Sequence, residues 1–489
     1  MATVVIVGAG PTGLTLACGL ARQGVGVRVL ERATEYNTNS RAKTLNPRSL
    51  EVLADLGLAD RLMEEGRTHL PFRKYFAGEH VADTDPYAGD HPTAERPYEA
   101  GLYLPQPRVE AALRELLASL GVRIETGSEL IGLAQDAEGV TAELADGRTV
   151  RGDHLVACDG GRSTVRKLLD IPFTGNNEDE PLMVLGDVEL EGLEPDAWHQ
   201  WFGPEGALLL CPFEGSGTWQ IQATPETDAE GRIVPPSAEG FQRLIAKHTG
   251  RPEIRVRRAG WLSTWRVNVR MAERYREGRV MLAGDCAHVH PVAGGLGMNT
   301  GIQDAWNLAW KLGYVLRGLA SPALLDTYQE ERLPIAAWTL DVTSAGMTAV
   351  LESTRTPGVG VEAGRVGDST GLSIDYRWSP LAEDRLGGPL RAGDRAPDGV
   401  LDEGPYGRLF EAFAGDRFTL LGFGPAALPA LDGLPDHVRP VAVPAGDTRT
   451  REAYGITEDA LVLVRPDNHI ALTAPAGARD AVDAYLERL

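Results

Sequence analysis

Cysteine is scarce in this chain. The 489 residues contain four cysteines, and no two of them form a CxxC pair. This scarcity excludes a disulfide-stabilised scaffold and a cysteine-rich zinc module, and it fits a reducing compartment. We therefore expect a cytoplasmic protein. The four residues are Cys18, Cys158, Cys211 and Cys286.

Long hydrophobic runs are missing as well. No uninterrupted apolar stretch reaches the roughly 18 residues that a membrane-spanning helix needs. The apolar segment Thr3 to Val7 follows no basic segment and leads into glycines, so it is typical of a buried strand and not of a signal peptide. We therefore expect no membrane-spanning segment.

Positive charge is also in short supply. Lys and Arg number 48 against 69 Asp and Glu, which gives a net charge of −21. An acidic surface repels phosphate backbones and anionic lipids, so we expect neither a nucleic-acid nor a membrane partner. The length predicts two to four domains, at roughly 100–200 residues per domain.

The chain begins with a strand, a glycine turn and a helix. The turn Gly8-Ala9-Gly10-Pro11-Thr12-Gly13 has the GxGxxG spacing, and a second predicted strand ends at Glu31. The glycines permit a tight turn, close approach of a pyrophosphate to the backbone, and packing of the helix on the strand. The carboxylate of Glu31 can accept hydrogen bonds from ribose hydroxyls and would repel a 2′-phosphate. The motif therefore predicts bound FAD or NAD rather than NADP.

Two further motifs follow apolar strands. One is Asp159-Gly160-Gly161-Arg162-Ser163-Thr164-Val165-Arg166, and the other begins at Gly284-Asp285 and continues through Gly297-Met298-Asn299 to a helix predicted over Ile302 to Leu316. Between them, the pattern from Met183 to Val269 has a period of two residues. This pattern predicts a mostly antiparallel sheet inserted into the first domain.

The three motifs, in this order, resemble those of the class A flavoprotein aromatic hydroxylases, single-component FAD monooxygenases with a para-hydroxybenzoate-hydroxylase-like fold. The resemblance implies an α/β fold in which a Rossmann-type, glutathione-reductase-like FAD domain carries an inserted antiparallel substrate domain. The C-terminal segment resembles the thioredoxin-like domain of phenol and aromatic-polyketide hydroxylases. Because that segment has no cysteine, thiol redox chemistry is excluded for it, and a packing or oligomer role remains. The expected divisions are 1–70, 101–180 and 275–350 for FAD, 71–100 and 181–274 for substrate, 351–394 for a connector, and 395–489 for the thioredoxin-like domain.

The same resemblance implies a set of FAD-binding residues. Asp285 is expected to bind the ribityl chain, and the backbone of residues 297–299 is expected to face the isoalloxazine edge. There the positive end of a helix would stabilise the anionic reduced flavin. An alternative for the second motif is helix capping by Asp159 or Ser163, with Arg166 in a surface ion pair. The full set is Gly8, Gly10, Thr12, Gly13, Glu31, Arg32, Arg41, Gln106, Asp159, Asp285, Pro291, Gly295, Gly297, Met298 and Asn299.

A metal site was weighed at His288 and His290, with Asp285 nearby. No further His, Cys or carboxylate ligand has suitable spacing, so we expect no metal and instead assign the two histidines to the lining or hydrogen bonding of the flavin site.

On the substrate side, the inserted sheet offers aromatic and amide side chains. Trp201, Trp219, Gln220 and Gln222 are the predicted substrate contacts, with the glutamines as orienting donors. The alternative is that the tryptophans belong to the core. His199 is a candidate for the base that accepts a phenolic proton, although a core position is also open to it. Together with Arg41 and with Pro291, a rigid wall near the ring, it completes the candidate catalytic residues.

The predicted activity is FAD-dependent hydroxylation of a phenolic or polyketide-like ring through a C4a-hydroperoxyflavin, with O2 and with NADPH or NADH bound transiently. The C-terminal domain and the presence of only five lysines favour natural-product biosynthesis. Degradation of a small phenol is an alternative. A halogenase is disfavoured because the WxWxIP motif is absent. A catalytically inactive flavin-binding protein, acting as a scaffold or sequestering a ligand, remains an alternative. The protein could also form a homo-oligomer.

Overall fold

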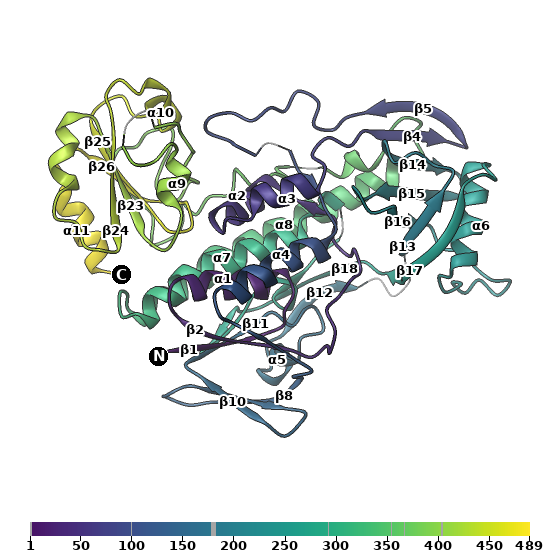
Figure 1. The fold of residues 1–489 in the computed structure, drawn as a ribbon, viewed down its shortest axis with the longest axis horizontal. Coiled ribbons are helices and arrows are strands. Elements are labelled where there is room, and N and C mark those ends of the chain that lie inside the picture. The colour runs from purple at the N-terminus through teal and green to yellow at the C-terminus, as the bar shows by residue number, and fades with distance from the viewer. Residues whose placement is uncertain are drawn as a thin grey trace.

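A computed structural model describes residues 2–98, 100–177, 182–291, 293–353, 355–365, 367–401 and 404–489. Three regions lie side by side along its longest axis: a strand-rich region around α6, a central region built on a parallel sheet, and a C-terminal region that ends at α11 (Figure 1). The boundary expected between residues 180 and 181 lies outside the described residues.

The central region is built on a largely parallel sheet with the order β19-β20-β11-β1-β2-β7. Strand β1, with the sequence TVVIV, lies between β11 and β2, and burial of all its residues after Thr3 explains why these are apolar. The sheet strands are β1 (Thr3–Val7), β2 (Gly26–Glu31), β7 (Ile124–Thr126), β11 (His154–Ala157), β19 (Arg276–Glu277) and β20 (Val280–Leu282).

Helices cover one side of this sheet, and the three-stranded sheet β10-β9-β8 lies on the other (Figure 1). The helix after the glycine turn begins at Pro11, whose fixed φ suits the first helical position. The helices of this region are α1 (Pro11–Arg22), α2 (Pro47–Asp55), α3 (Ala59–Glu65), α4 (Gln106–Ser119), α5 (Thr164–Leu168), α7 (Gly297–Leu316) and α8 (Asp326–Ser353). The smaller strands are β3 (Thr44–Leu45), β6 (Leu102–Tyr103), β8 (Leu130–Gln135), β9 (Val140–Leu144), β10 (Thr149–Gly152), β12 (Phe173–Asn177), β18 (Asn268–Ala272) and β21 (His288–Val289).

The inserted sheet has the order β17-β13-β16-β15-β14-β4-β5. All its neighbouring strands are antiparallel except β14 and β4, which pair in parallel. The segment between residues 71 and 100 therefore contributes two edge strands to the sheet. One face of the sheet packs on α6 (Ala238–Thr249). Phe241 of that helix is buried in a hydrophobic cluster with Trp201 and Trp219 of the sheet. The strands are β4 (Phe72–Phe76), β5 (Glu79–Thr84), β13 (Met183–Glu191), β14 (Trp198–Gly203), β15 (Gly206–Pro212), β16 (Thr218–Ala223) and β17 (Arg255–Trp265).

The C-terminal region is a mixed sheet with the order β22-β26-β25-β23-β24. Strands β23 and β24 are parallel, whereas β25 and β26 form an antiparallel hairpin. The sheet packs against the end of α7, where Trp310 and Tyr314 share a buried cluster with Phe418. Its elements are β22 (Glu383–Asp384), β23 (Phe418–Phe423), β24 (Val438–Val443), β25 (Ala460–Val464), β26 (Ile470–Pro475), α9 (Leu409–Phe413), α10 (Thr448–Ala453) and α11 (Arg479–Glu487).

No helix in the described part of the chain combines the length and the apolar character that a membrane crossing requires.

His154 at the start of β11 should make stability depend on pH. Burial and the charges of Arg279 and Arg276 lower its pKa to about 4. Below about pH 6.5 the unfolded chain takes up a proton that the folded chain refuses. The free energy of unfolding should therefore fall by roughly 2–3 kcal/mol between pH 7 and pH 4.5 on account of this group.

We expect His154→Gln to remove that part of the pH dependence. Urea unfolding at the two pH values measures it, with His91→Gln in an exposed loop as the control. An unchanged pH dependence in His154→Gln would contradict the prediction.

Candidate functional site

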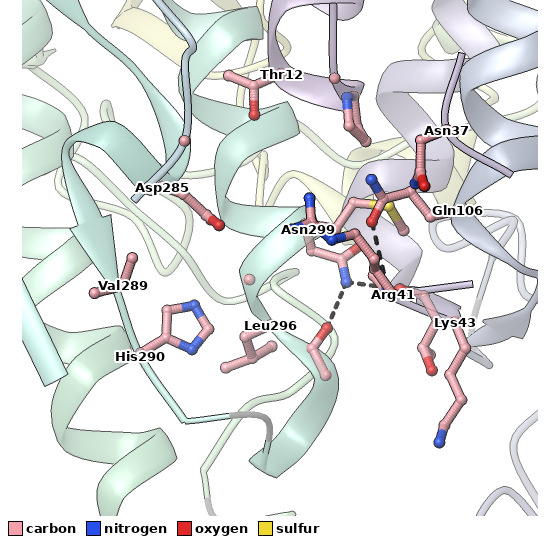
Figure 2. A pocket seen from close by; sticks show the side chains of 18 of the residues that line it. Thr12, Asn37, Arg41, Lys43, Gln106, Asp285, Val289, His290, Leu296 and Asn299 are labelled. Carbon is pink, nitrogen blue, oxygen red and sulfur yellow. Dashed lines mark hydrogen bonds between the residues drawn. The ribbon is translucent and has the colours of Figure 1, made fainter. Parts of the chain in front are cut away.

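A cavity of about 920 Å³ connects the three glycine motifs with the inserted sheet. Its walls come from the β1–α1 turn, the end of β2, the segment before β3, the loop before α7, and strands of the sheet. Figure 2 shows part of it, with Asp285, Val289 and His290 on one side and Arg41, Lys43 and Gln106 on the other.

The first motif forms a tight cradle. Gly8 has a φ of +106°, and a Cβ there would overlap the carbonyl of Cys158, while a Cβ on Gly13 would overlap the carbonyl oxygen of Gly8. Gly10 differs, because apart from its chain neighbours no atom of the described residues lies within 4 Å of its would-be Cβ. Gly8 and Gly13 are thus required by the packing of the protein itself, whereas Gly10 leaves open space at the cavity wall.

Glu31 closes this cradle from the second strand. Its carboxylate accepts hydrogen bonds from the backbone N–H groups of Ala9 (2.8 Å) and Ala33 (2.9 Å). The side chain therefore fixes the turn and borders the cavity together with Arg32 and Thr12.

The first and third motifs interlock at Thr12. Cβ atoms added to Gly284 and Gly301 would meet the Thr12 hydroxyl, the first at 2.6 Å. Gly284 also has a φ of +70°. The two glycines therefore let the β1–α1 turn and the start of α7 approach each other closely. Gly301 belongs to the third motif and stands one helical turn after Gly297.

The second motif caps a helix and borders the cavity as well. The Oδ2 atom of Asp159 accepts from Thr164 N (2.8 Å), and Ser163 Oγ accepts from Arg166 N (3.0 Å). The capping that was the alternative interpretation of this motif is thus observed. The surface ion pair of Arg166 is wrong, because this side chain is buried and donates to the carbonyl oxygens of Cys286 (2.7 Å) and Gly161 (3.0 Å). Arg166 instead joins the second motif to the third.

The third motif places backbone N–H groups at a helix start. Helix α7 begins at Gly297, earlier than the predicted Ile302, so Gly297, Met298 and Asn299 form its first turn. The Asn299 side chain donates to the carbonyl oxygens of Thr44 (3.0 Å) and Gly295 (2.8 Å), which fixes the start of the helix at the cavity (Figure 2). A helix start with free N–H groups stabilises negative charge.

The Asp285 and Arg41 side chains point into the cavity from opposite walls (Figure 2). Asp285 is exposed to the cavity, and the positive charges of His288 and Arg41 act on its carboxylate. The Gln106 amide donates to Glu110 (2.7 Å) and accepts from Ala42 N (3.3 Å), which fixes the segment that carries Arg41.

His288 and His290 have different surroundings. His288 is buried, and its Nε2 lies 2.7 Å from Asp304 Oδ2. Asp304 also accepts from Arg332 Nε (2.7 Å) and from Gly284 N (3.0 Å). His290 borders the cavity, and burial lowers its pKa to about 4. His288 therefore belongs to the support behind the third motif, and His290 to the lining.

These residues fit a bound dinucleotide. The cradle combines three features: the open space beside Gly10, the Glu31 carboxylate at the end of β2, and the N-termini of α1 and α7. In addition, Asp159 Oδ1 is buried without a hydrogen-bond partner among the described residues. A ribose or phosphate group supplies the donors and acceptors that such a wall needs.

The far end of the cavity is aromatic. Gln220 and Gln222 border it as predicted, but Trp201, Trp219 and His199 do not. Trp201 and Trp219 face α6 in the buried cluster, and His199 packs beside the stacked rings of Tyr75 and Trp201. This corrects their assignment as substrate contacts and as the base: adjacent residues of a strand face opposite sides of the sheet, so Trp198 lines the cavity while His199 and Trp201 do not. The aromatic lining that was missed is Phe72, Tyr87, Tyr103, Trp198, Trp261 and Trp265.

Most other predicted residues meet at this cavity. Pro291 and Gly295 border it, as do the residues already described, whereas Gly13 lies behind the wall. The connector, at Val361, Glu362 and Arg365, also contributes to the lining, which the sequence did not indicate. A three-motif dinucleotide cradle that opens onto an aromatic chamber defines a flavoprotein-type enzyme site.

Comparisons with known proteins identify the family. Residues 1–343 match the family model for an FAD binding domain, and residues 390–489 match the model for the C-terminal part of aromatic-ring hydroxylases. The chain is 38% identical, over all of both chains, to a flavin-dependent monooxygenase of Mycobacteroides abscessus. It is 36% identical to a 6-methylpretetramide 4-monooxygenase of Streptomyces rimosus, covering 99% of this chain and 93% of that one.

A solved structure agrees with this assignment. The ternary complex of aklavinone-11 hydroxylase with FAD and aklavinone superposes with a TM-score of 0.84 at 29% identity, covering 100% of this chain and 98% of that one. The chain therefore belongs to the FAD-dependent aromatic monooxygenases, and FAD is the cofactor that its N-terminal domain family binds.

Proposed function

We propose that this protein hydroxylates a polycyclic phenolic compound, using O2 and a reduced nicotinamide, in the biosynthesis of a natural product. The observation that carries the proposal is the continuity of one cavity from the dinucleotide cradle to an aromatic chamber. Relatives named for aromatic polyketide substrates support the substrate class. Bound FAD would supply transfer of electrons from the nicotinamide and transfer of one oxygen atom of O2 to the ring.

Each wall of the cavity has its own task in this proposal. Glu31 and Gly10 hold the adenosine and pyrophosphate part, and Asp285 holds the ribityl chain. The N-terminus of α7, at residues 297–299, stabilises negative charge on the reduced ring system. Arg41, Gln106, Asp159 and Pro291 complete the cofactor side, and NADPH or NADH binds transiently on the same region.

The aromatic chamber orients the substrate. Trp198, Trp261 and Tyr103 offer flat surfaces for a planar ring system, and Gln222 offers an amide beside them. The chamber lies between the inserted sheet and the connector, which together keep water from the reacting ring. We further propose the domain divisions given above. The strand order of the C-terminal region, a parallel pair followed by an antiparallel hairpin and a helix, supports a thioredoxin-like domain there.

The test is product formation from labelled oxygen. Purified protein reconstituted with FAD, supplied with NADH or NADPH and 18O2, should convert members of a panel of hydroxylated naphthoquinones and anthraquinones into products that contain one 18O atom, measured by mass spectrometry. Protein without FAD is the control. Stoichiometric H2O2 with every compound and no labelled product would contradict hydroxylation and favour a ligand-binding role.

A further inference from the structure

We propose that Lys43 is a specificity-determining residue that binds an ionised oxygen of the substrate ring system, so that the protein prefers anionic phenols or enols. This inference rests on the proposed function, because it names the substrate class for the same cavity. Lys43 was not among the residues predicted from the sequence, and it borders the cavity between the cofactor cradle and the aromatic chamber.

The backbone around Lys43 is fixed. The carbonyl oxygen of Lys43 accepts from Leu104 N (2.9 Å), and the preceding carbonyl, of Ala42, accepts from Gln106 N (2.9 Å). These bonds continue the β3–β6 pairing. The Lys43 side chain therefore starts from a rigid position and not from a loop that can swing away.

A chain of hydrogen bonds fixes the ammonium group itself. Asp187 of β13 accepts from both the backbone N–H (2.8 Å) and the hydroxyl of Ser40. Since the Ser40 hydroxyl donates to Asp187, it accepts from the Gln220 amide nitrogen (2.6 Å). That orientation turns the Gln220 carbonyl oxygen toward Lys43, whose Nζ donates to it at 2.7 Å.

Among the described residues, the charge of Lys43 has no carboxylate in direct contact. No carboxylate of the described residues lies within 4.0 Å of its Nζ, whereas the buried Lys74 pairs with Glu362 and the buried Lys311 pairs with Glu331 at 2.7 Å. Asp187 is the acidic group that acts on Lys43 electrostatically, but both of its carboxylate oxygens accept hydrogen bonds from Ser40. The Cys211 thiol also faces Lys43, but burial raises its pKa to about 11, so it stays neutral.

Lys43 is half-buried at the cavity wall, and its hydrogen-bond acceptor there, Gln220, is neutral. A partly desolvated cation without a carboxylate beside it is unfavourable, and an anionic ligand would offset that cost. The pKa of Lys43 agrees with this, since burial lowers it while Cys211 and Asp187 oppose the decrease. The positive charge of Lys43 is therefore available to neutralise an anionic ligand in the cavity.

The aromatic side chains around the Lys43 ammonium group favour an anion that is carried by an aromatic ring. The Lys43 Nζ lies 4.2 Å from the centroid of the Trp198 ring. Phe72 and Tyr103 meet that indole edge to face, with centroids 5.0 and 6.0 Å apart from it. A planar ring stacked in this chamber would bring its oxygen to the ammonium group. An ionised oxygen also makes the ring more electron-rich, which favours attack on an electrophilic oxygen.

Ligand binding to the oxidised FAD-loaded protein tests the inference without turnover. The probes are two pairs that differ in charge: 2-hydroxy-1,4-naphthoquinone, an acidic enol ionised at neutral pH, with its methyl ether, and anthraquinone-2-carboxylate with the carboxamide. Binding is read from the perturbation of flavin absorbance. Wild type should prefer the anion of each pair, and Lys43→Met should weaken the anion about 10- to 100-fold, as for a hydrogen bond to a charged group, while the neutral partner changes little.

Two control variants define the outcomes. Lys43→Arg should retain most of the preference, and Lys247→Met, which makes the same change of charge on the exposed surface of α6, should leave it intact. Absence of a preference for the anions in wild type, or equal weakening of both members of a pair in Lys43→Met, would overturn the inference. Preserved anion selectivity without any hydroxylated product would instead refute the proposed function and leave the role of Lys43 standing.

Discussion

Gly10→Ala should lose FAD without losing stability, whereas Gly13→Ala should lose both. At Gly10 the backbone has a φ of −79°, which alanine adopts readily, and no described residue beyond the chain neighbours would contact the new methyl group. The methyl would instead occupy the space that a pyrophosphate needs next to the backbone. We expect at least a 100-fold loss of FAD affinity, about 2.7 kcal/mol.

At Gly13 the same methyl group would overlap the carbonyl oxygen of Gly8, which is backbone and cannot turn aside. We expect the apoprotein to lose about 1–3 kcal/mol or more of its unfolding free energy, as in overpacked cores. Fluorescence titration of apoprotein with FAD and urea unfolding without FAD separate the two effects. A Gly13→Ala apoprotein as stable as wild type, or a Gly10→Ala variant with undiminished FAD affinity, would contradict this account.

The second large effect, a loss of unfolding free energy, is expected where the C-terminal region contacts helices α7 and α8. Glu331 of α8 is fully buried and accepts hydrogen bonds from Arg465 (2.7 and 2.9 Å), Lys311 of α7 (2.7 Å) and Ser379 (2.7 Å). Burial alone would raise the pKa of Glu331, but the charges of Arg465 and Lys311 hold it well below its usual range. Asp467 provides the second anion, so two buried cations balance two buried anions.

Arg465→Met should therefore cost about 3–5 kcal/mol, because it leaves two buried carboxylates facing one lysine. The control is Arg232→Met, which breaks two ion pairs of a 74% exposed side chain and should cost less than about 1 kcal/mol. The first urea-unfolding transition measures both. Equal shifts in the two variants would mean that the buried network does not stabilise the contact between these regions.

This contact gives the cysteine-free C-terminal region a structural role. Arg48, Glu51 and Arg395 form a second buried ionic group across the same boundary. The two networks connect the loop between β25 and β26, together with Arg395, to α2, α7 and α8, and α7 starts at the cofactor cradle. We expect these regions to unfold together.

The cofactor side was largely predictable from the sequence. The turn after β1, the acidic end of β2 and the strand before Gly284 are local features, and each depends on residues that are close in the chain. A glycine that lets backbone approach backbone is conspicuous in a sequence because few other residues can replace it. The long helix α8 was not predicted, because it is interrupted by Pro334 and its apolar residues do not follow one face.

The substrate side depended on the tertiary structure. A period of two assigns residues of a strand to two faces but does not say which face meets the cavity, so Trp201 and Trp219 were placed in the chamber although they pack on α6. The connector was likewise not expected to line the site.

The sequence by itself determined the class of this protein and its FAD-binding family, and it predicted most of the motif residues that border the cavity, since both are encoded in short contiguous motifs. The tertiary structure decided which aromatic face forms the chamber, how the C-terminal region is joined to the rest, and that Lys43 lies there without a counter-ion. The physical reason is that burial and charge balance are properties of segments brought together from distant parts of the chain.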